Sequence, residues 1–240
     1  MRASMLFQWN EAHTPTRWLM AGLLGLLPIT AQAADPIRDT LQVHGFLSQA
    51  LVITDDNDFF GASSDHAGSL EYTELGLNAS FRPHHKVLVA AQLLSRRAGG
   101  DTSDAEPTLD YGVIDYQMVS NQSRTLGLQL GRFKNPFGLY NQTRDVAFTR
   151  PSILLPQSIY FDRTRALGLA ADGVNVYWEE HTAAGTLRFR SGLGRPQTGS
   201  DLTRQLFNGA ASDVSAAEPS AIAQLLFEDR SGQWVAALST

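Results

Sequence analysis

Segments of alternating polarity recur along this chain, and they restrict its fold more than any other feature. In the segment 72–82, Leu75 and Leu77 alternate with Glu74 and Asn78. Successive side chains of a β-strand point to opposite faces, so each such segment presents one apolar and one polar face. Segments of about ten residues with this period are typical of antiparallel sheets and of transmembrane β-barrels. The sequence therefore predicts an all-β fold.

The pattern predicts nine strands joined by links of two kinds. The expected strands are 41–53, 72–82, 86–96, 109–119, 126–134, 174–179, 187–190, 221–229 and 233–240. Short turns at 83–85 and 121–123 contrast with long polar links at 54–70, 97–108 and 195–220. Such alternation favours an antiparallel up-and-down arrangement. After residue 33 no stretch reaches roughly 18 consecutive apolar residues, so any later membrane crossing would use strands, as in a transmembrane β-barrel.

The segment 109–119 follows the pattern less closely than its neighbours. Under strict alternation its two carboxylates, Asp110 and Asp115, lie on opposite faces. One of the two would then sit on the face that the other strands keep apolar.

The N-terminus has the features of an export signal. Arg17 precedes the apolar run 18–29, which ends in the small residues of Ala31-Gln32-Ala33. This pattern predicts a cleaved signal peptide at 1–33 and a mature domain at 34–240, and a membrane anchor is the alternative. The chain contains no cysteine, which fits an exported protein without disulfides and excludes thiolate catalysis and cysteine zinc sites.

Charge and motifs exclude several functional classes. The chain has 19 basic and 24 acidic residues, a formal net charge of −5, which does not favour nucleic-acid binding. It contains no G-x-S-x-G motif, and no set of Ser, His and Asp residues stands out as a triad. We therefore expect no enzymatic activity, no cofactor and no metal site.

The link 134–166 is the most unusual part of the sequence. It follows the turn Asn135-Pro136-Phe137-Gly138, in which proline and glycine occupy favourable positions. The link is too rich in large apolar residues for a disordered segment, and loops of this length inside domains are often functional. We expect it to fold back onto the sheet.

The same region resembles a known family. The segments G-R-F-K-N-P-F-G-L at 131–139, S-I-L-L-P at 152–156 and H-G-F-L-S-Q at 44–49 are similar to Gram-negative outer-membrane porins of the general type. The resemblance covers residue 40 to the end of the sequence. It implies a location in the cell outer membrane in contact with lipid, a homotrimer, and a barrel of roughly 16 strands. It also implies that 134–166 is the loop that folds into the lumen and constricts the pore.

The predicted strand count does not close such a barrel. Bacterial single-chain barrels have an even number of strands, because an open edge in hydrocarbon leaves backbone groups unpaired. Nine strands are about half of the number that the resemblance implies. We therefore expect the sequence to represent the N-terminal half of a barrel.

The charges of the link predict how such a pore would act on solutes. Between residues 134 and 165 the link has five basic residues against Asp145 and Asp162, and this excess would favour small anions mildly. The expected solute-facing residues are Arg132, Lys134, Arg144, Arg150, Arg163, Arg165, Arg188, Arg190 and Glu74. In the alternative interpretation, the arginines pair with wall carboxylates such as Glu74 and Asp172 and only fasten the link.

Two functions of different classes remain open. The first is a passive diffusion channel for small hydrophilic solutes, with a substrate-specific channel as a variant of it. The second is an exported β-sheet binding module that is not a channel, in the periplasm or at the surface. The two differ in what covers the apolar strand faces, since a barrel presents them to lipid and a soluble module packs them in a core.

Overall fold

The computed structural model describes residues 40–58, 60–61, 64–97, 105–198, 202 and 218–240. The described residues belong to one compact unit that begins at Asp35. The predicted signal peptide, 1–33, and most of the link 195–220 lie outside the described residues. Within these ranges, no helix combines the length and the apolar character needed to cross a membrane.

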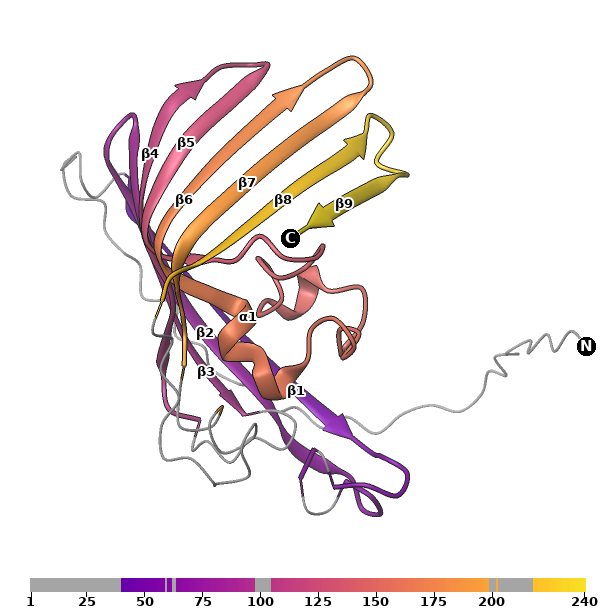
Figure 1. Cartoon of the computed structure of the whole chain (residues 1–240). Helices are drawn as coiled ribbons and strands as arrows, with labels where there is room; N and C mark the ends of the chain where they lie inside the picture. The colour runs from indigo at the N-terminus through magenta and orange to yellow at the C-terminus, as the bar shows by residue number, and fades with distance from the viewer. Residues whose placement is uncertain (1–39, 59, 62–63, 98–104, 199–201, 203–217) are drawn as a thin grey trace, which may run out of the picture. The chain divides into compact units, whose positions relative to one another are not determined.

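In the described part of the chain, nine antiparallel strands form one sheet in sequence order (Figure 1). They are β1 (Gln42–Val52), β2 (Ser69–His84), β3 (Val87–Arg97), β4 (Thr108–Ser120), β5 (Arg124–Lys134), β6 (Ala170–His181), β7 (Gly185–Pro196), β8 (Ser220–Asp229) and β9 (Val235–Ser239). Each strand pairs with the next along the chain, and the described residues of β1 and β9 each pair with a single strand. The predicted all-β, antiparallel, up-and-down sheet is confirmed.

Between β5 and β6 the chain forms a long excursion, which we call the β5–β6 loop (135–169). It contains the 3₁₀ turns η2 (Ala147–Thr149) and η3 (Asp162–Thr164) and the short helix α1 (Arg165–Leu169). The loop lies on the concave side of the curved sheet (Figure 1). Gln224 Nε2 on β8 donates to the Gly138 carbonyl at 2.6 Å, so the start of the loop contacts the wall.

A clasp of hydrogen bonds joins the two ends of the β5–β6 loop. The Asn135 backbone N–H donates to the Leu169 carbonyl at 2.9 Å. Asn141 Nδ2 lies 2.9 to 3.1 Å from the carbonyls of Asn135, Gly168 and Leu169. Asn141 is 1 % exposed, so water does not compete for these bonds. The loop therefore leaves and re-enters the sheet at one point.

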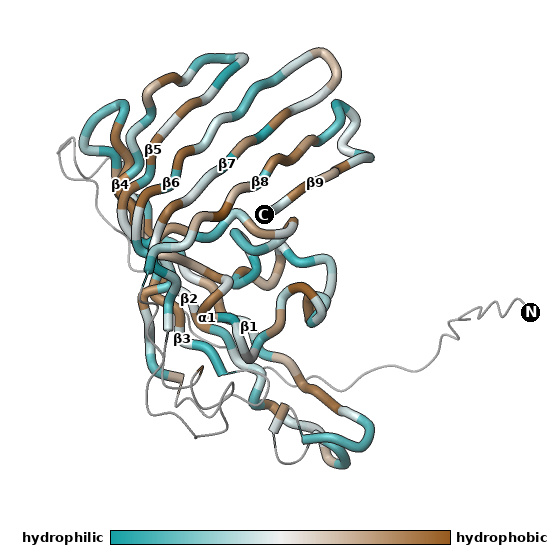
Figure 2. Tube along the Cα trace, viewed as in Figure 1, coloured by the Kyte–Doolittle hydropathy of each residue, from teal (hydrophilic) through white to brown (hydrophobic). Residues whose placement is uncertain are grey.

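The two faces of the sheet have opposite polarity. Outward side chains are apolar and exposed, for example Leu47 at 72 % and Leu193 at 58 %. On the other face Glu74, Gln92 and Asn175 are each less than 5 % exposed. Along the strands, hydrophobic and hydrophilic residues alternate (Figure 2). This polarity is the reverse of a water-soluble sheet, which buries its apolar face.

The expectation for Asp110 and Asp115 is wrong, because β4 contains a bulge. Gln92 pairs with Tyr111 and Leu93 with Leu109, so Asp110 has no direct partner on β3. A bulge inserts one residue and shifts the phase of the alternation. Both carboxylates are consequently buried, at 4 % and 6 % exposure, among polar partners of the inner face.

Candidate functional site

Charged side chains gather between the β5–β6 loop and the inner face of the sheet. They come from β2 to β5 and from the loop, and ion pairs connect them in two neighbouring groups. We call them the ion-pair network, and its members are Glu74, Arg96, Asp110, Lys134, Arg144, Asp145, Arg150, Asp162 and Arg165.

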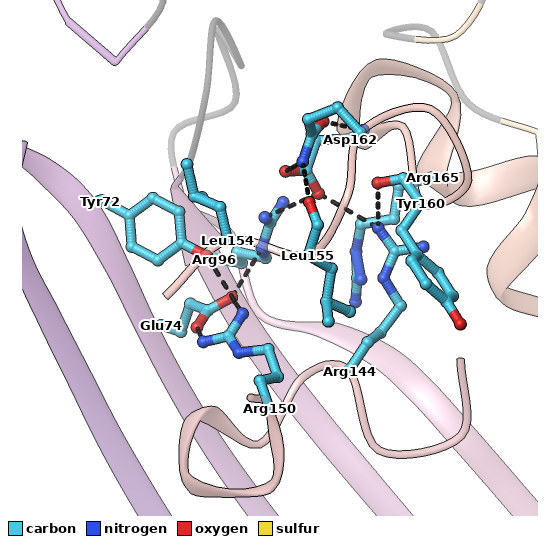
Figure 3. A pocket seen from close by; sticks show the side chains of 11 residues that line it. Tyr72, Glu74, Arg96, Arg144, Arg150, Leu154, Leu155, Tyr160, Asp162 and Arg165 are labelled. Carbon is cyan, nitrogen blue, oxygen red and sulfur yellow. Dashed lines mark hydrogen bonds and ion pairs between the residues drawn. The ribbon is translucent and has the colours of Figure 1, made fainter. Parts of the chain in front are cut away.

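Glu74 on β2 anchors one half of the network (Figure 3). Its side chain is 1 % exposed and accepts hydrogen bonds from Arg96 Nε at 2.9 Å and from Arg150 Nη2 at 2.7 Å. Arg150 Nη1 also donates to the hydroxyl of Tyr72 at 3.1 Å. Because Glu74 and Arg96 are cross-strand partners of β2 and β3, the sheet register itself places this pair. Arg150 thus attaches the loop to the sheet.

Asp162 on the loop continues the network. It accepts hydrogen bonds from Arg96 Nη2 at 3.0 Å and from Arg144 Nη2 at 3.2 Å. Arg144 also donates to the Tyr160 carbonyl at 3.2 Å, and its guanidinium lies 5.6 Å from the centre of the Tyr160 ring. Arg96 therefore bridges a carboxylate of the sheet and a carboxylate of the loop.

The second half of the network surrounds Asp110 and Asp145. Lys134 Nζ lies 2.6 Å from Asp110 Oδ2 and also binds Asp145. Arg165 binds Asp145 and lies 3.7 Å from Asp110 Oδ1. Gln92 Nε2 donates to Asp110 at 2.7 Å. Because the bulge in β4 turns Asp110 inward, Asp110 contacts the same two cations, Lys134 and Arg165, as Asp145 of the loop.

Arg144 and Asp145 are buried loop residues, and each has oppositely charged neighbours that favour its ionised form. Burial alone would raise the pKa of Asp145, but Arg165 and Lys134 lower it further than burial raises it, so its pKa lies below the usual range. Burial and the neighbouring Arg165 lower the pKa of Arg144 to about 10, against the attraction of Asp162. Both groups are therefore charged at neutral pH.

The network is nearly neutral and nearly closed. Its five cations face four carboxylates, which leaves one positive charge. Between Tyr72, Arg150 and Asp162 lies a hollow with room for about one water molecule. Arg150 Nε lies in this region with no hydrogen-bond partner in the described residues. The hollow is too small for an organic solute.

The structure places the other predicted site residues apart from the network. Arg132 shares the outward face with Leu130 and pairs with Asp172, with Nε 2.8 Å from Oδ1. Alternation along β5 turns Arg132 outward, so the structure does not bring it to the network. The side chain of Arg163 is outside what the structure describes.

Arg188 and Arg190 lie on β7, on the inner face. Arg188 bridges Glu179 at 2.7 Å and Glu228 at 2.8 Å, so two carboxylates face its single positive charge. Arg190 is the register partner of Tyr177. Glu179, Tyr177 and Asp115 attract its guanidinium, whereas Arg188 repels it.

Sequence reasoning missed four members of the network: Arg96, Asp110, Asp145 and Asp162. Arg96 is on the polar face of its predicted strand, and the signal that could have identified it is the register that places it opposite Glu74. Asp110 depends on the bulge, which no alternation rule predicts. Asp145 and Asp162 were counted only as charges of the loop. Within the described ranges, no group of three or more His, Asp or Glu side chains is placed to hold a metal ion.

Comparisons with protein-family models, with curated proteins and with solved structures found no match for this chain. The functional argument therefore depends on the geometry of the sheet and the loop.

Proposed function

We propose that this chain contributes to an outer-membrane β-barrel pore through which small hydrophilic solutes diffuse passively. The observation that supports this proposal most directly is the reversed polarity of the sheet. Outward residues such as Leu47, Leu75 and Leu193 are more than half exposed, while polar side chains fill the inner face. Lipid covers an apolar outer surface favourably, whereas water does not, and a polar inner face suits an aqueous lumen.

In this proposal the β5–β6 loop narrows the pore, in agreement with the resemblance of 134–166 to a porin constriction loop. The loop is on the concave side of the sheet and is attached by buried ion pairs, including Arg150 to Glu74 on β2 and Asp145 to Lys134 on β5. Breaking such a pair leaves a buried charge without its partner, which destabilises the folded state. A loop attached in this way would keep the same cross-section during solute passage.

The charge distribution supports a weak preference for anions. The excess positive charge predicted for the link 134–166 is largely neutralised. Glu74 on the sheet pairs with Arg150, and Asp110 on the sheet pairs with Lys134. Arg150 pairs with Glu74, as the alternative interpretation expects. One net positive charge remains in the network, while Arg188 and Arg190 on the inner wall face Glu179, Glu228 and Asp115. The cationic excess is therefore confined to the region of the loop, where it would enrich anions only mildly.

The proposal is tested by locating the protein and measuring its conductance. We expect the product of the complete open reading frame that contains this sequence, expressed in a Gram-negative host, to sediment with the outer membrane, and the purified protein to produce conductance steps in KCl across a planar bilayer. A protein that is found in the soluble periplasmic fraction and produces no conductance would contradict the channel. That result would favour the alternative, an exported β-sheet module that binds a partner through its apolar face.

A further inference from the structure

The outward face of β5, β6 and β7 is arranged in rows that the strand register defines. The three strands lie side by side, and each row takes one outward side chain from each strand (Figure 1). Near the end of β5 that leads into the β5–β6 loop, one row consists of Arg132, Asp172 and Arg195. We call these three residues the charged row.

An apolar belt follows the charged row on the same three strands. It consists of three further rows of outward side chains, which are apolar except for one serine. They are Leu130, Val174 and Leu193; Leu128, Val176 and Ser191; and Leu126, Trp178 and Phe189. The members of the first of these rows are 46 %, 39 % and 58 % exposed, so the belt is open to its surroundings where it meets the charged row.

The belt has charges at both ends, and the two ends differ in net charge. At the far end, Arg124 Nη2 lies 3.0 Å from Glu180 Oε1, and this pair is neutral. In the charged row, Arg132 binds both oxygens of Asp172, with Nε 2.8 Å from Oδ1 and Nη2 3.1 Å from Oδ2. Two guanidinium groups therefore share one carboxylate, which leaves one positive charge in the charged row.

Arg195 is the cation of the charged row that has no carboxylate of its own. Its register partner Asp172 is occupied by Arg132 and also forms a hydrogen bond with Gln197. Glu218 precedes β8 at the same end of the sheet, but no ion pair joins it to Arg195 in the part of the chain that the structure describes. Because Arg195 is exposed, its guanidinium is accessible to an anion from outside the protein.

We propose that the charged row and the adjoining belt bind an anionic membrane phospholipid. This inference rests on the proposed function, because it requires the outward face to contact lipid, and it names the partner of that face. A guanidinium presents several N–H donors in a plane, which suits the oxygens of a phosphate group, so Arg195 would hold the headgroup. The acyl chains would lie along the belt, where they cover apolar side chains.

Phosphatidylglycerol and phosphatidylcholine with the same acyl chains are suitable probes, because they share the phosphate and differ in net charge. Native mass spectrometry of the detergent-solubilised product of the complete open reading frame measures the binding of each lipid. We expect phosphatidylglycerol to bind about fivefold more tightly than phosphatidylcholine. Arg195→Gln should remove most of this preference, and Arg195→Lys should retain most of it.

The far end of the belt provides a matched control. Arg124→Gln removes an outward arginine of β5 that is paired with Glu180, and the preference for phosphatidylglycerol should persist in this variant. Circular dichroism of the variants verifies that the strands are unchanged. Glycerol phosphate has the headgroup phosphate without acyl chains, so at equal concentration it should not displace the lipid.

Four results would overturn the inference. They are equal binding of the two lipids by the unmodified protein, an undiminished preference in Arg195→Gln, an equal loss of preference in Arg124→Gln, and displacement of the lipid by glycerol phosphate. Fractionation and KCl conductance of the same protein separate this inference from the proposed function. A soluble protein without conductance contradicts the proposed function and the lipid site together. A conducting outer-membrane protein that binds both lipids equally contradicts the lipid site alone.

Discussion

The inner face of the sheet satisfies its polar groups in two different ways. In the ion-pair network, charged residues of the strands bind charged residues of the β5–β6 loop. In the adjacent region of β4 to β6, which we call the wall array, Asp115, Gln129, Asn175 and Tyr177 bind one another. Gln129 Nε2 donates to Asp115 at 2.9 Å, and the Tyr177 hydroxyl donates to it at 2.7 Å.

The difference shows what each region contributes. The network joins the loop to the sheet, and the loss of Glu74 leaves Arg150 buried without a carboxylate partner. The wall array joins strand to strand and contains one charge among neutral groups, so the loss of a terminal member such as Tyr177 costs a single hydrogen bond. The position of the loop should therefore depend on the network. The wall array should contribute to the stability of the sheet without affecting the loop.

The largest effect is expected for Glu74→Gln. Arg96 and Arg150 would lose their shared carboxylate at a site where it is 1 % exposed, and we expect a loss of about 3–5 kcal/mol in the free energy of unfolding. Denaturant unfolding measures this loss, and faster trypsin cleavage after Arg144 reports release of the loop. The matched control Glu71→Gln removes an exposed pair with Arg97 and should change stability by about 0–1 kcal/mol. Equal effects of the two variants would contradict a special role for the network.

The second prediction concerns acid. Because the pKa of Asp145 is lowered by Arg165 and Lys134, its carboxylate stabilises the fold above about pH 4, and this contribution is lost as the pH falls through the lowered pKa. Hydrogen exchange of the loop amides, followed by mass spectrometry, should accelerate in that range while exchange of the wall array stays slow. In Asp145→Asn the loop should exchange faster at neutral pH and show little further change on acidification. A loop that remains protected in the unmodified protein at all acidic pH values would refute this assignment.

The third prediction is a smaller change in the wall array. Tyr177→Phe removes the hydroxyl that donates to Asp115 but leaves the bond from Gln129, so we expect a loss of about 2 kcal/mol in the free energy of unfolding. Trypsin cleavage of the loop should be unchanged, which distinguishes this variant from Glu74→Gln. Release of the loop in Tyr177→Phe would show that the two regions are coupled.

The smallest effect is expected for Arg190→Gln. Glu179 and Asp115 attract Arg190 without forming a direct ion pair, so stability should fall only slightly, while the ratio of anion to cation permeability should fall by about twofold. Reversal potentials in a KCl gradient measure this ratio. Arg124→Gln is a suitable control, because Arg124 is 52 % exposed and pairs with Glu180. An unchanged ratio in Arg190→Gln would contradict the proposed anion preference.

Much of the sheet could be predicted from the sequence, and the reason is physical. Alternation at residues such as Leu75 and Leu77 fixes both the strand and its face, because a shift of one residue would invert every side chain. The up-and-down order follows from the links. The bulge at Asp110 could not be predicted, since it depends on how β3 and β4 align, and that alignment is a property of two strands.

The site was only partly predictable for a related reason. The sequence indicates that the loop is basic and apolar, and it suggested Glu74 as a partner for the loop arginines. The partner chosen by each cation depends on the three-dimensional path of the loop. Arg96 is 66 residues from Asp162, and its role as a bridge follows only from the folded geometry. Alternation along the strand could have predicted that Arg132 points outward. Arg132 is also part of the segment 131–139 that resembles porins, and this resemblance suggested a position in the pore.

The clasp at Asn141 has a consequence for how the chain would respond to cutting. Because hydrogen bonds join the two ends of the β5–β6 loop at Asn135 and Leu169, a single break in the peptide chain between them leaves both pieces bound to the same point of the sheet. Arg150, paired with Glu74, and Arg165, next to Asp110, hold one piece or the other to the sheet independently. A nicked protein would therefore migrate as two fragments after denaturation and as one particle before it.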